Sequence, residues 1–161
     1  MTAESLLDRL NMVTRSFARA LLVAGRNHPL RLPLQAIVDD LMVADDVPDT
    51  GAFDLIVWPS GLENIDDVPG ALIRARRALA PDGLLIGALV GDGSFSLLRR
   101  LLAGEGMRGI ARMHPQIDLN TLGNLLQRAG FALPVADVEA TTLRYADWRR
   151  LVADLRHAGL A

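Results

Sequence analysis

Short apolar runs alternate along this chain with stretches of helical periodicity, and this alternation limits the folds available to it. The run at 20–23 ends at Gly25, the run at 54–58 ends at Pro59, and residues 84–90 are again almost wholly apolar. Runs of this kind are typical of strands covered on both faces. Since strands separated by helices favour a parallel sheet, we expect an α/β fold, a mostly parallel sheet with helices on both faces.

The N-terminal segment is predicted to be a helix. Thr2 belongs to the residue types that cap helix N-termini. Apolar side chains then recur at steps of four, three and four residues, which places them on one helix face: Leu6, Leu10, Val13 and Phe17. We therefore expect one helix to carry all four of these side chains.

Four more helices are predicted from capping residues. Each capping residue stands just before apolar side chains at helical spacing: Asp67, Ser94, Asp118 and Asp147. Gly130 follows the third of these helices and Gly159 the fourth, as is common at helix C-termini. Between the last two helices, residues 131–145 contain two extended pieces. These pieces would fit a hairpin or a pair of antiparallel edge strands.

Composition limits the domain count and the classes of partner. With 161 residues, 50% of them hydrophobic, and no repeat or linker, the chain is expected to form one domain over 1–161. The net charge of −2 gives no general attraction to nucleic acid, and the absence of cysteine excludes disulfides and thiolate metal sites. No apolar run reaches the ~20 residues of a membrane span. The N-terminus lacks the basic start of a secretory signal, so we expect a cytoplasmic protein without stable membrane insertion.

The link between the first two strands is expected to be short. After Gly25, residues 26–33 include two prolines, and the second strand is placed at 34–38. A parallel crossover requires about a dozen residues or more, including its helix. A full helical crossover is therefore not expected, and the second strand is predicted to pair antiparallel or to lie at the sheet edge behind an extended loop. Either arrangement would remove a covering helix.

From Phe53 onward the chain resembles class I S-adenosylmethionine (SAM) methyltransferases. A strand, a helix, the turn RRALAPDG at 76–83 and another strand follow one another as in that family. The stretch LGNLLQRAGFALPV at 122–135 is similar to malonyl-carrier-protein methyltransferases of biotin synthesis and, more closely, to methyltransferase-like assembly factors of respiratory complex I. The resemblance implies a Rossmann-like fold whose first half binds SAM.

The cofactor-binding half, residues 1–52, is shortened relative to that family. The resemblance implies an acidic, glycine-rich turn after the first strand, where glycines let the backbone approach the cofactor. Only Gly25 of such a turn remains, and Pro29 removes a backbone donor. Asp39 or Asp40 would be the acid that contacts the ribose hydroxyls, although aspartates at the start of a loop often only cap it or stay solvated. The sequence thus predicts that SAM binding has been lost.

No catalytic or metal-binding residue stands out. Relatives usually carry a His-Trp pair after the third strand, where this chain has Glu63 and Asn64. Glu63 could act as a base, but an exposed loop glutamate is more often structural or solvated. The three histidines, His28, His114 and His157, do not have the spacing of metal ligands. The acidic residues of 39–49 do not match a calcium-binding loop, so we expect no bound metal.

Three functions stay open, and the preferred one is binding without catalysis. A methyltransferase-like protein that has lost SAM would act as a subunit or assembly partner, and its uncovered sheet edge would favour a homo-oligomer or a heteromer with a related protein. The alternative is a SAM-dependent methyltransferase with an atypical, shortened donor site, since methyl transfer can rely on positioning. The third is a small-molecule or lipid-intermediate binding module, with a cleft near Trp58, Phe95 and Met107.

Overall fold

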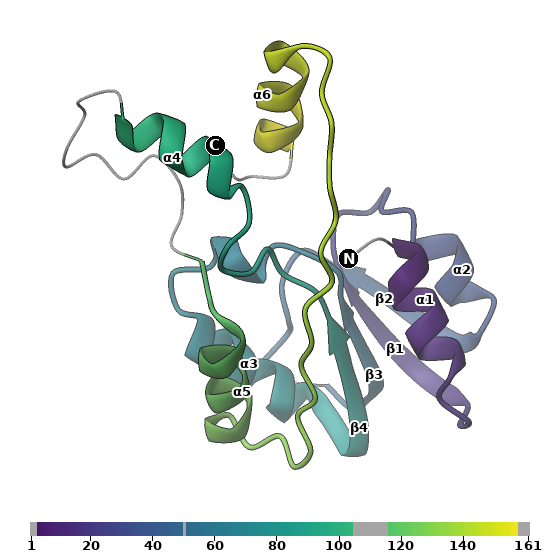
Figure 1. Cartoon of the computed structure of the whole chain (residues 1–161). Coiled ribbons are helices and arrows are strands. Elements are labelled where there is room, and N and C mark those ends of the chain that lie inside the picture. Colours follow the sequence, from purple (N-terminus) through teal and green to yellow (C-terminus); the bar gives the residue numbers. More distant parts are fainter. Residues whose placement is uncertain (1–2, 50, 105–115, 158–161) are drawn as a thin grey trace.

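A four-stranded parallel sheet forms the centre of the molecule (Figure 1). The computed structural model describes residues 3–49, 51–104 and 116–157. The strand order is β2-β1-β3-β4, and every neighbouring pair runs parallel. The strands are β1 (Phe17–Val23), β2 (Val38–Ala44), β3 (Phe53–Trp58) and β4 (Leu79–Gly87). The predicted α/β fold with a mostly parallel sheet is confirmed.

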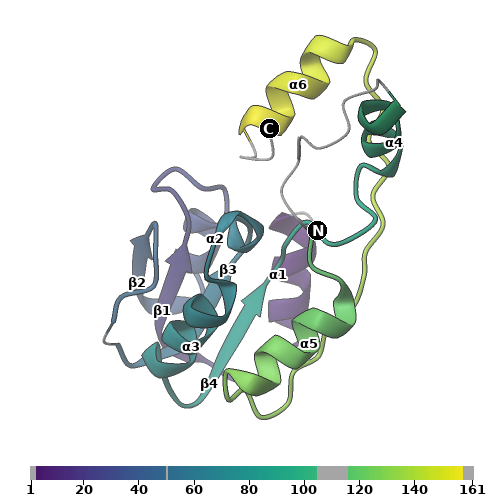
Figure 2. The same ribbon diagram turned by 90° about the vertical axis from the view of Figure 1, so that its left-hand side faces the viewer.

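Helices cover both faces of this sheet, as predicted. Figures 1 and 2 show α1 and α2 on one face and α3 and α5 on the other, whereas α4 and α6 lie beyond the end to which the β4 arrow points. The helices are α1 (Ala3–Asn11), α2 (Arg31–Gln35), α3 (Val68–Ala78), α4 (Ser96–Gly104), α5 (Leu119–Arg128) and α6 (Trp148–His157), with a 3₁₀ turn, η1, at Leu62–Asn64.

Each face of the sheet has its own hydrophobic core. In β3, Leu55 and Val57 pack in the cluster that contains the buried side chains of α1 and α2. Ile56 and Trp58 pack in the other cluster, with the buried side chains of α3. All four side chains are almost fully buried. This two-sided burial explains why residues 55–58 of the strand are all apolar instead of alternating with polar residues.

The N-terminal helix is shorter than its apolar spacing predicts. Helix α1 ends at Asn11, and Phe17 is the first residue of β1. The periodicity continued into the strand because Leu6, Leu10 and Phe17 all pack in one cluster, although they come from two elements. The carboxylate of Asp54 fixes the start of β1, where it accepts hydrogen bonds from the amides of residues 18 and 19 at 2.9 and 3.0 Å. Thr2, the expected cap, lies outside the described residues.

The second strand was misplaced by the sequence analysis, and so was the link before it. Residues 34–37 are not part of a strand: helix α2 ends at Gln35, and β2 begins at Val38 and runs parallel to β1. Pro33 lies in the first turn of α2, where a backbone N–H has no partner within the helix, so proline is tolerated there. With β2 starting at 38, the crossover is long enough for a short helix. The expected position at the sheet edge is correct, since β2 is an edge strand, but the antiparallel pairing and the extended loop are both wrong, because β2 runs parallel to β1 and α2 lies in the crossover.

Three of the four predicted helix caps are confirmed. The carboxylate of Asp67 accepts the amide of Gly70 at 2.9 Å, and that of Asp147 accepts the amide of Arg149 at 3.0 Å. Asp118 accepts both the hydroxyl and the amide of Thr121, and these bonds hold the pKa of Asp118 below its ordinary value. Helix α4 begins two residues after Ser94, behind Phe95, which has a left-handed φ of 55°. Gly130 ends α5 with φ 92°, while Gly159 lies outside the described residues.

The expected antiparallel edge strands within 131–145 are not formed. This segment is an extended strap without strand pairing. Pro134 lacks a backbone donor for a ladder, and Leu133 and Val135 beside it are each 91% exposed. The strap is held to α1 instead, since Asp137 pairs with Arg9 at 2.8 Å and Glu139 accepts the hydroxyl of Ser5 at 3.2 Å.

The cap of α3 gives a stability prediction. Replacing Asp67 by alanine removes the acceptor of the Gly70 amide, and we expect it to lower the free energy of unfolding by about 1 kcal/mol. Urea unfolding followed by circular dichroism measures the change. Asp66→Ala, an equal loss of charge at the exposed neighbouring position, should leave stability within about 0.5 kcal/mol. Equal effects of the two substitutions would contradict the capping role.

Candidate functional site

The order of the strands reverses between β1 and β3. From β1 the chain crosses to β2 on one side, and from β3 it crosses to β4 on the other. In open α/β sheets, ligands bind beyond the carboxyl ends of the strands at such a reversal. The loops that follow β1, β2 and β3 therefore form the candidate site, at the end of the sheet that faces α4 and α6 in Figure 2.

Gly25, the residue predicted to remain from a cofactor turn, lies in the loop that follows β1. The amide of Ala24 before it donates to the carbonyl of Ala44 at 2.9 Å, which joins the carboxyl ends of β1 and β2. Gly25 does not have the left-handed φ that would demand glycine. A Cβ added to Gly25 would meet no atom within 4 Å. The glycine therefore leaves the backbone open to a ligand at this edge.

Asp39 and Asp40 lie at the amino end of β2, so the structure does not bring them to Gly25. The expectation that they follow the second strand is wrong, because that strand begins at Val38 rather than ending there. Asp40 is opposite Arg19 in the ladder and pairs with its guanidinium at 3.4 Å. Both carboxylates are exposed at the edge remote from the loops of the candidate site.

A second acidic pair, Asp45 and Asp46, follows β2 directly at its carboxyl end. The carboxylate of Asp46 accepts the amide of Val47 at 2.7 Å and lies 3.7 Å from the guanidinium of Arg74. Asp45 is exposed, and in the described part of the chain no hydrogen bond or ion pair engages its carboxylate. The apolar run at 41–44, which is followed by Asp45, is the sequence feature that could have placed the second strand correctly and its acidic pair after it.

His28 shapes the loop after β1. Its backbone amide donates to the carbonyl of Gly25 at 3.0 Å, and its imidazole Nδ1 accepts the amide of Leu30 at 3.2 Å. Partial burial lowers the pKa of His28 from its ordinary value. The neutral imidazole is therefore favoured, which is the form that can accept the amide of Leu30.

Glu63 was expected to be an exposed loop residue, but it is buried. Only 8% of its surface is exposed, within the turn η1 that follows β3. Its carboxylate accepts the amide of Gly61 at 3.1 Å, and Gly61 has a left-handed φ of 93°. Such burial is uncommon for a carboxylate, and the polar neighbours of Glu63 in the sequence gave no sign of it.

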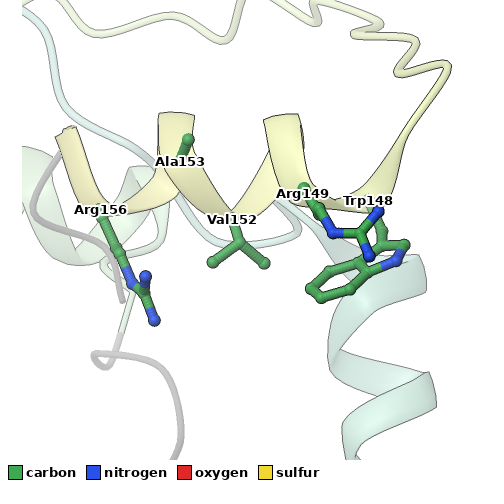
Figure 3. A pocket seen from close by; sticks show the side chains of 5 residues that line it. All are labelled: Trp148, Arg149, Val152, Ala153 and Arg156. Atoms are coloured by element: carbon green, nitrogen blue, oxygen red, sulfur yellow. The ribbon is translucent and has the colours of Figure 1, made fainter.

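The residues proposed for a cleft do not share one. Trp58 is 4% exposed and packs in the core beneath α3, while Phe95 lies before α4 and Met107 lies outside the described residues. A shallow pocket occurs on α6 instead (Figure 3), lined by Trp148, Arg149, Val152, Ala153 and Arg156. The guanidinium of Arg149 lies 5.1 Å from the centre of the Trp148 ring. None of the lining residues belongs to the loops that follow β1, β2 or β3.

The part of the chain that the structure describes shows neither a metal-ligand cluster nor a membrane-spanning helix. Over 3–49, 51–104 and 116–157, no three His, Asp or Glu side chains gather as they would around a metal ion. His114, one of the three histidines considered as a ligand, lies outside these ranges. No helix within them has the length and apolar character to cross a membrane.

Comparison with known proteins gives consistent similarities. The profile of a methyltransferase domain family matches residues 11–134. Arginine-hydroxylase NDUFAF5, mitochondrial, of Danio rerio is 30% identical, over 94% of this chain and 57% of its own length. Malonyl-[acyl-carrier protein] O-methyltransferases of Laribacter hongkongensis and Gallionella capsiferriformans are 35% and 31% identical, over 68% and 80% of this chain and 36% and 42% of their own. The chain thus spans about half the length of these curated relatives, or less.

A solved structure shares the fold. A SAM-dependent methyltransferase of Thermotoga maritima, described as a possible histamine N-methyltransferase, superposes with a TM-score of 0.52 at 19% sequence identity. The superposition covers 82% of this chain and 72% of the other. At this identity the likeness concerns the fold alone.

His28 gives a pH prediction. Its pKa is lowered in the folded chain, so below pH ~6.5 the unfolded chain binds more protons and stability falls as the pH decreases through the lowered pKa. Above pH ~6.5 the contribution is complete. Urea unfolding between pH 5 and 8 should show a weaker acid dependence in His28→Asn, whose Oδ1 can accept the Leu30 amide. His157→Asn is the control, and an unchanged profile for His28→Asn would contradict the assignment.

Proposed function

Because this chain belongs to the class I SAM-dependent methyltransferase family, we propose that it binds SAM beyond the carboxyl ends of β1, β2 and β3 and transfers the methyl group. One observation carries the proposal: the parallel crossover through α2 places Gly25 and Asp45 at the same edge of the sheet. This arrangement supports a donor site in the half of the chain that was expected to be too short for one.

The residues at this edge fit the donor. Open space beside Gly25 accommodates a ligand against the backbone, and the unengaged carboxylate of Asp45 suits the two ribose hydroxyls. When bound, SAM supplies an electrophilic methyl group on a positively charged sulfur. The contribution of the protein is to hold and orient the donor, which is sufficient for a reaction that relies on positioning.

The acceptor that we propose is a carboxylate on an acyl thioester. The names of several relatives describe O-methylation of malonyl-[acyl-carrier protein]. A carboxylate acceptor is ionised at neutral pH, so its methylation requires no general base. This agrees with a site in which the sequence offers no evident base. The chain covers only part of those relatives, so their substrate enters here as a proposal.

Isothermal titration calorimetry tests donor binding. We expect SAM and its product S-adenosylhomocysteine to bind the wild-type chain with micromolar affinity. Asp45→Ala should weaken both about tenfold or more, because a hydrogen bond to a charged group contributes about 1.5–3 kcal/mol. Asp39→Ala removes the same charge at the opposite end of β2 and should leave both affinities unchanged. No binding of either ligand at millimolar concentration would refute the proposal.

Gly25→Val gives an independent test of the same site. Because a Cβ at this position meets no protein atom, we expect the variant to keep its stability while its valine side chain occupies the space of the donor. Affinity for SAM should fall at least tenfold, and thermal unfolding without ligand should be unchanged. A Gly25→Val variant that binds SAM normally would place the donor elsewhere.

Binding or assembly without catalysis is the second candidate function. The strap at 131–145 exposes a row of apolar side chains, Leu133, Val135 and Val138, to 91, 91 and 75%. Edge strand β2 adds Met42, which is 38% exposed. Such surfaces favour association, as a homo-oligomer or a heteromer with a related protein.

Sedimentation velocity at micromolar concentration tests this second function. If the strap mediates self-association, the wild-type chain sediments as a dimer, and the double variant Leu133→Ser, Val135→Ser sediments as a monomer. Both side chains are almost fully exposed, so the variant should keep its fold. A wild-type chain that stays monomeric and captures no related protein would count against the association.

A further inference from the structure

We infer that the carboxylate of Glu63 faces the sulfonium of bound SAM and makes the site prefer the charged donor over its neutral product. The inference rests on the proposed donor site. It starts from the burial of Glu63, which is 92% removed from solvent although ionisable side chains are seldom buried without a partner.

The carboxylate has few partners within the described part of the chain. One hydrogen bond reaches it, from the amide of Gly61 to Oε2 at 3.1 Å. The ion pairs among the described residues involve other acids, so no arginine there neutralises Glu63. The other carboxylate oxygen, Oε1, is not among the buried polar atoms that lack a partner, so it stays in contact with solvent. A cationic ligand can therefore meet this oxygen without breaking the hydrogen bond from Gly61.

The position of Glu63 brings it to the site where the donor is proposed to bind. Turn η1 lies in the loop after Trp58, the last residue of β3, and β3 is adjacent to β1, with Leu22 opposite Val57. The loops that carry Glu63 and Gly25 thus follow neighbouring strands at the point where the strand order reverses. The left-handed conformation of Gly61 bends the chain so that its amide meets the carboxylate two residues later, which fixes the turn.

The chemistry of methyl transfer makes this carboxylate selective. An electron pair of the acceptor forms a bond to the methyl carbon, the bond from that carbon to sulfur breaks, and its electrons pass to sulfur. The sulfonium therefore becomes a neutral thioether, and the attraction to Glu63 is lost. A carboxylate at this place holds SAM and releases S-adenosylhomocysteine, which favours turnover.

Glu63→Gln separates this role from a structural one. Glutamine keeps the shape of the side chain and a carbonyl oxygen for the Gly61 amide, so only the charge is removed. In calorimetry we expect the affinity for SAM to fall about tenfold and that for S-adenosylhomocysteine to change less than about twofold. Glu4→Gln, on the exposed first turn of α1, is the matched control and should change neither. Equal losses for the two ligands, or no loss for either, would overturn the inference.

A second measurement uses the wild-type chain alone, in case the variant does not fold. A SAM analogue with an ammonium group in place of the sulfonium keeps the charge and should bind more tightly than S-adenosylhomocysteine. If SAM and the ammonium analogue both bind no more tightly than S-adenosylhomocysteine, the role of Glu63 is overturned, while the proposed donor site still stands. Failure of all three ligands to bind would instead refute the proposed function, and this inference with it.

Discussion

The parallel pairing of β1 with β2 on one side and with β3 on the other is the interaction on which the rest of the structure depends. It makes β1 a central strand whose residues 20–23 are buried against helices on both faces. It also requires a crossover from β1 to β2, which contains α2, since two adjacent parallel strands cannot be joined by a tight turn. Because the chain crosses in opposite directions from β1 and from β3, the loops beyond their carboxyl ends meet, and the site arises from topology before any particular side chain is considered.

The sequence predicts this arrangement well for strands that are buried on both faces of the sheet. The apolar run at 54–58 predicts β3 to within one residue, and Asp67 predicts the start of α3. Both predictions depend only on neighbouring residues in the sequence. The second strand was misread for a physical reason. The run at 34–38 has both an apolar character suited to a strand and a spacing suited to one helical turn, and periodicity over so few residues does not separate the two. Leu30, the N-cap of α2, and Leu34 within it are both buried, and this burial distinguishes a helix from a strand only in the packed fold.

The candidate site was less predictable than the fold, because its properties arise from packing. The second strand was expected at 34–38 but lies at 38–44. Asp39 and Asp40 are therefore at its amino end, and Asp45 and Asp46 occupy the place after its carboxyl end where the first pair was expected. The burial of Glu63 follows from a turn closed by Gly61 at the end of a central strand, and the polar residues around it in the sequence suggested the opposite. The strap at 131–145 does not form the expected hairpin. Pro134 interrupts its apolar residues, and Asp137 and Glu139 bind side chains of α1.

The proposed donor site, with one glycine and a five-residue crossover helix, would bind SAM differently from a site built on a glycine-rich turn and a long helix. The macrodipole of so short a helix is small, so the usual attraction of an anionic group to a helix N-terminus is weak here. Asp45 and Glu63, which follow β2 and β3 at this edge, are carboxylates, and carboxylates attract cations. SAM carries a positive sulfur, and its product does not. A shortened site of this kind would therefore compensate for lost backbone contacts by recognising charge, with Asp45 directed to the ribose and Glu63 to the sulfonium.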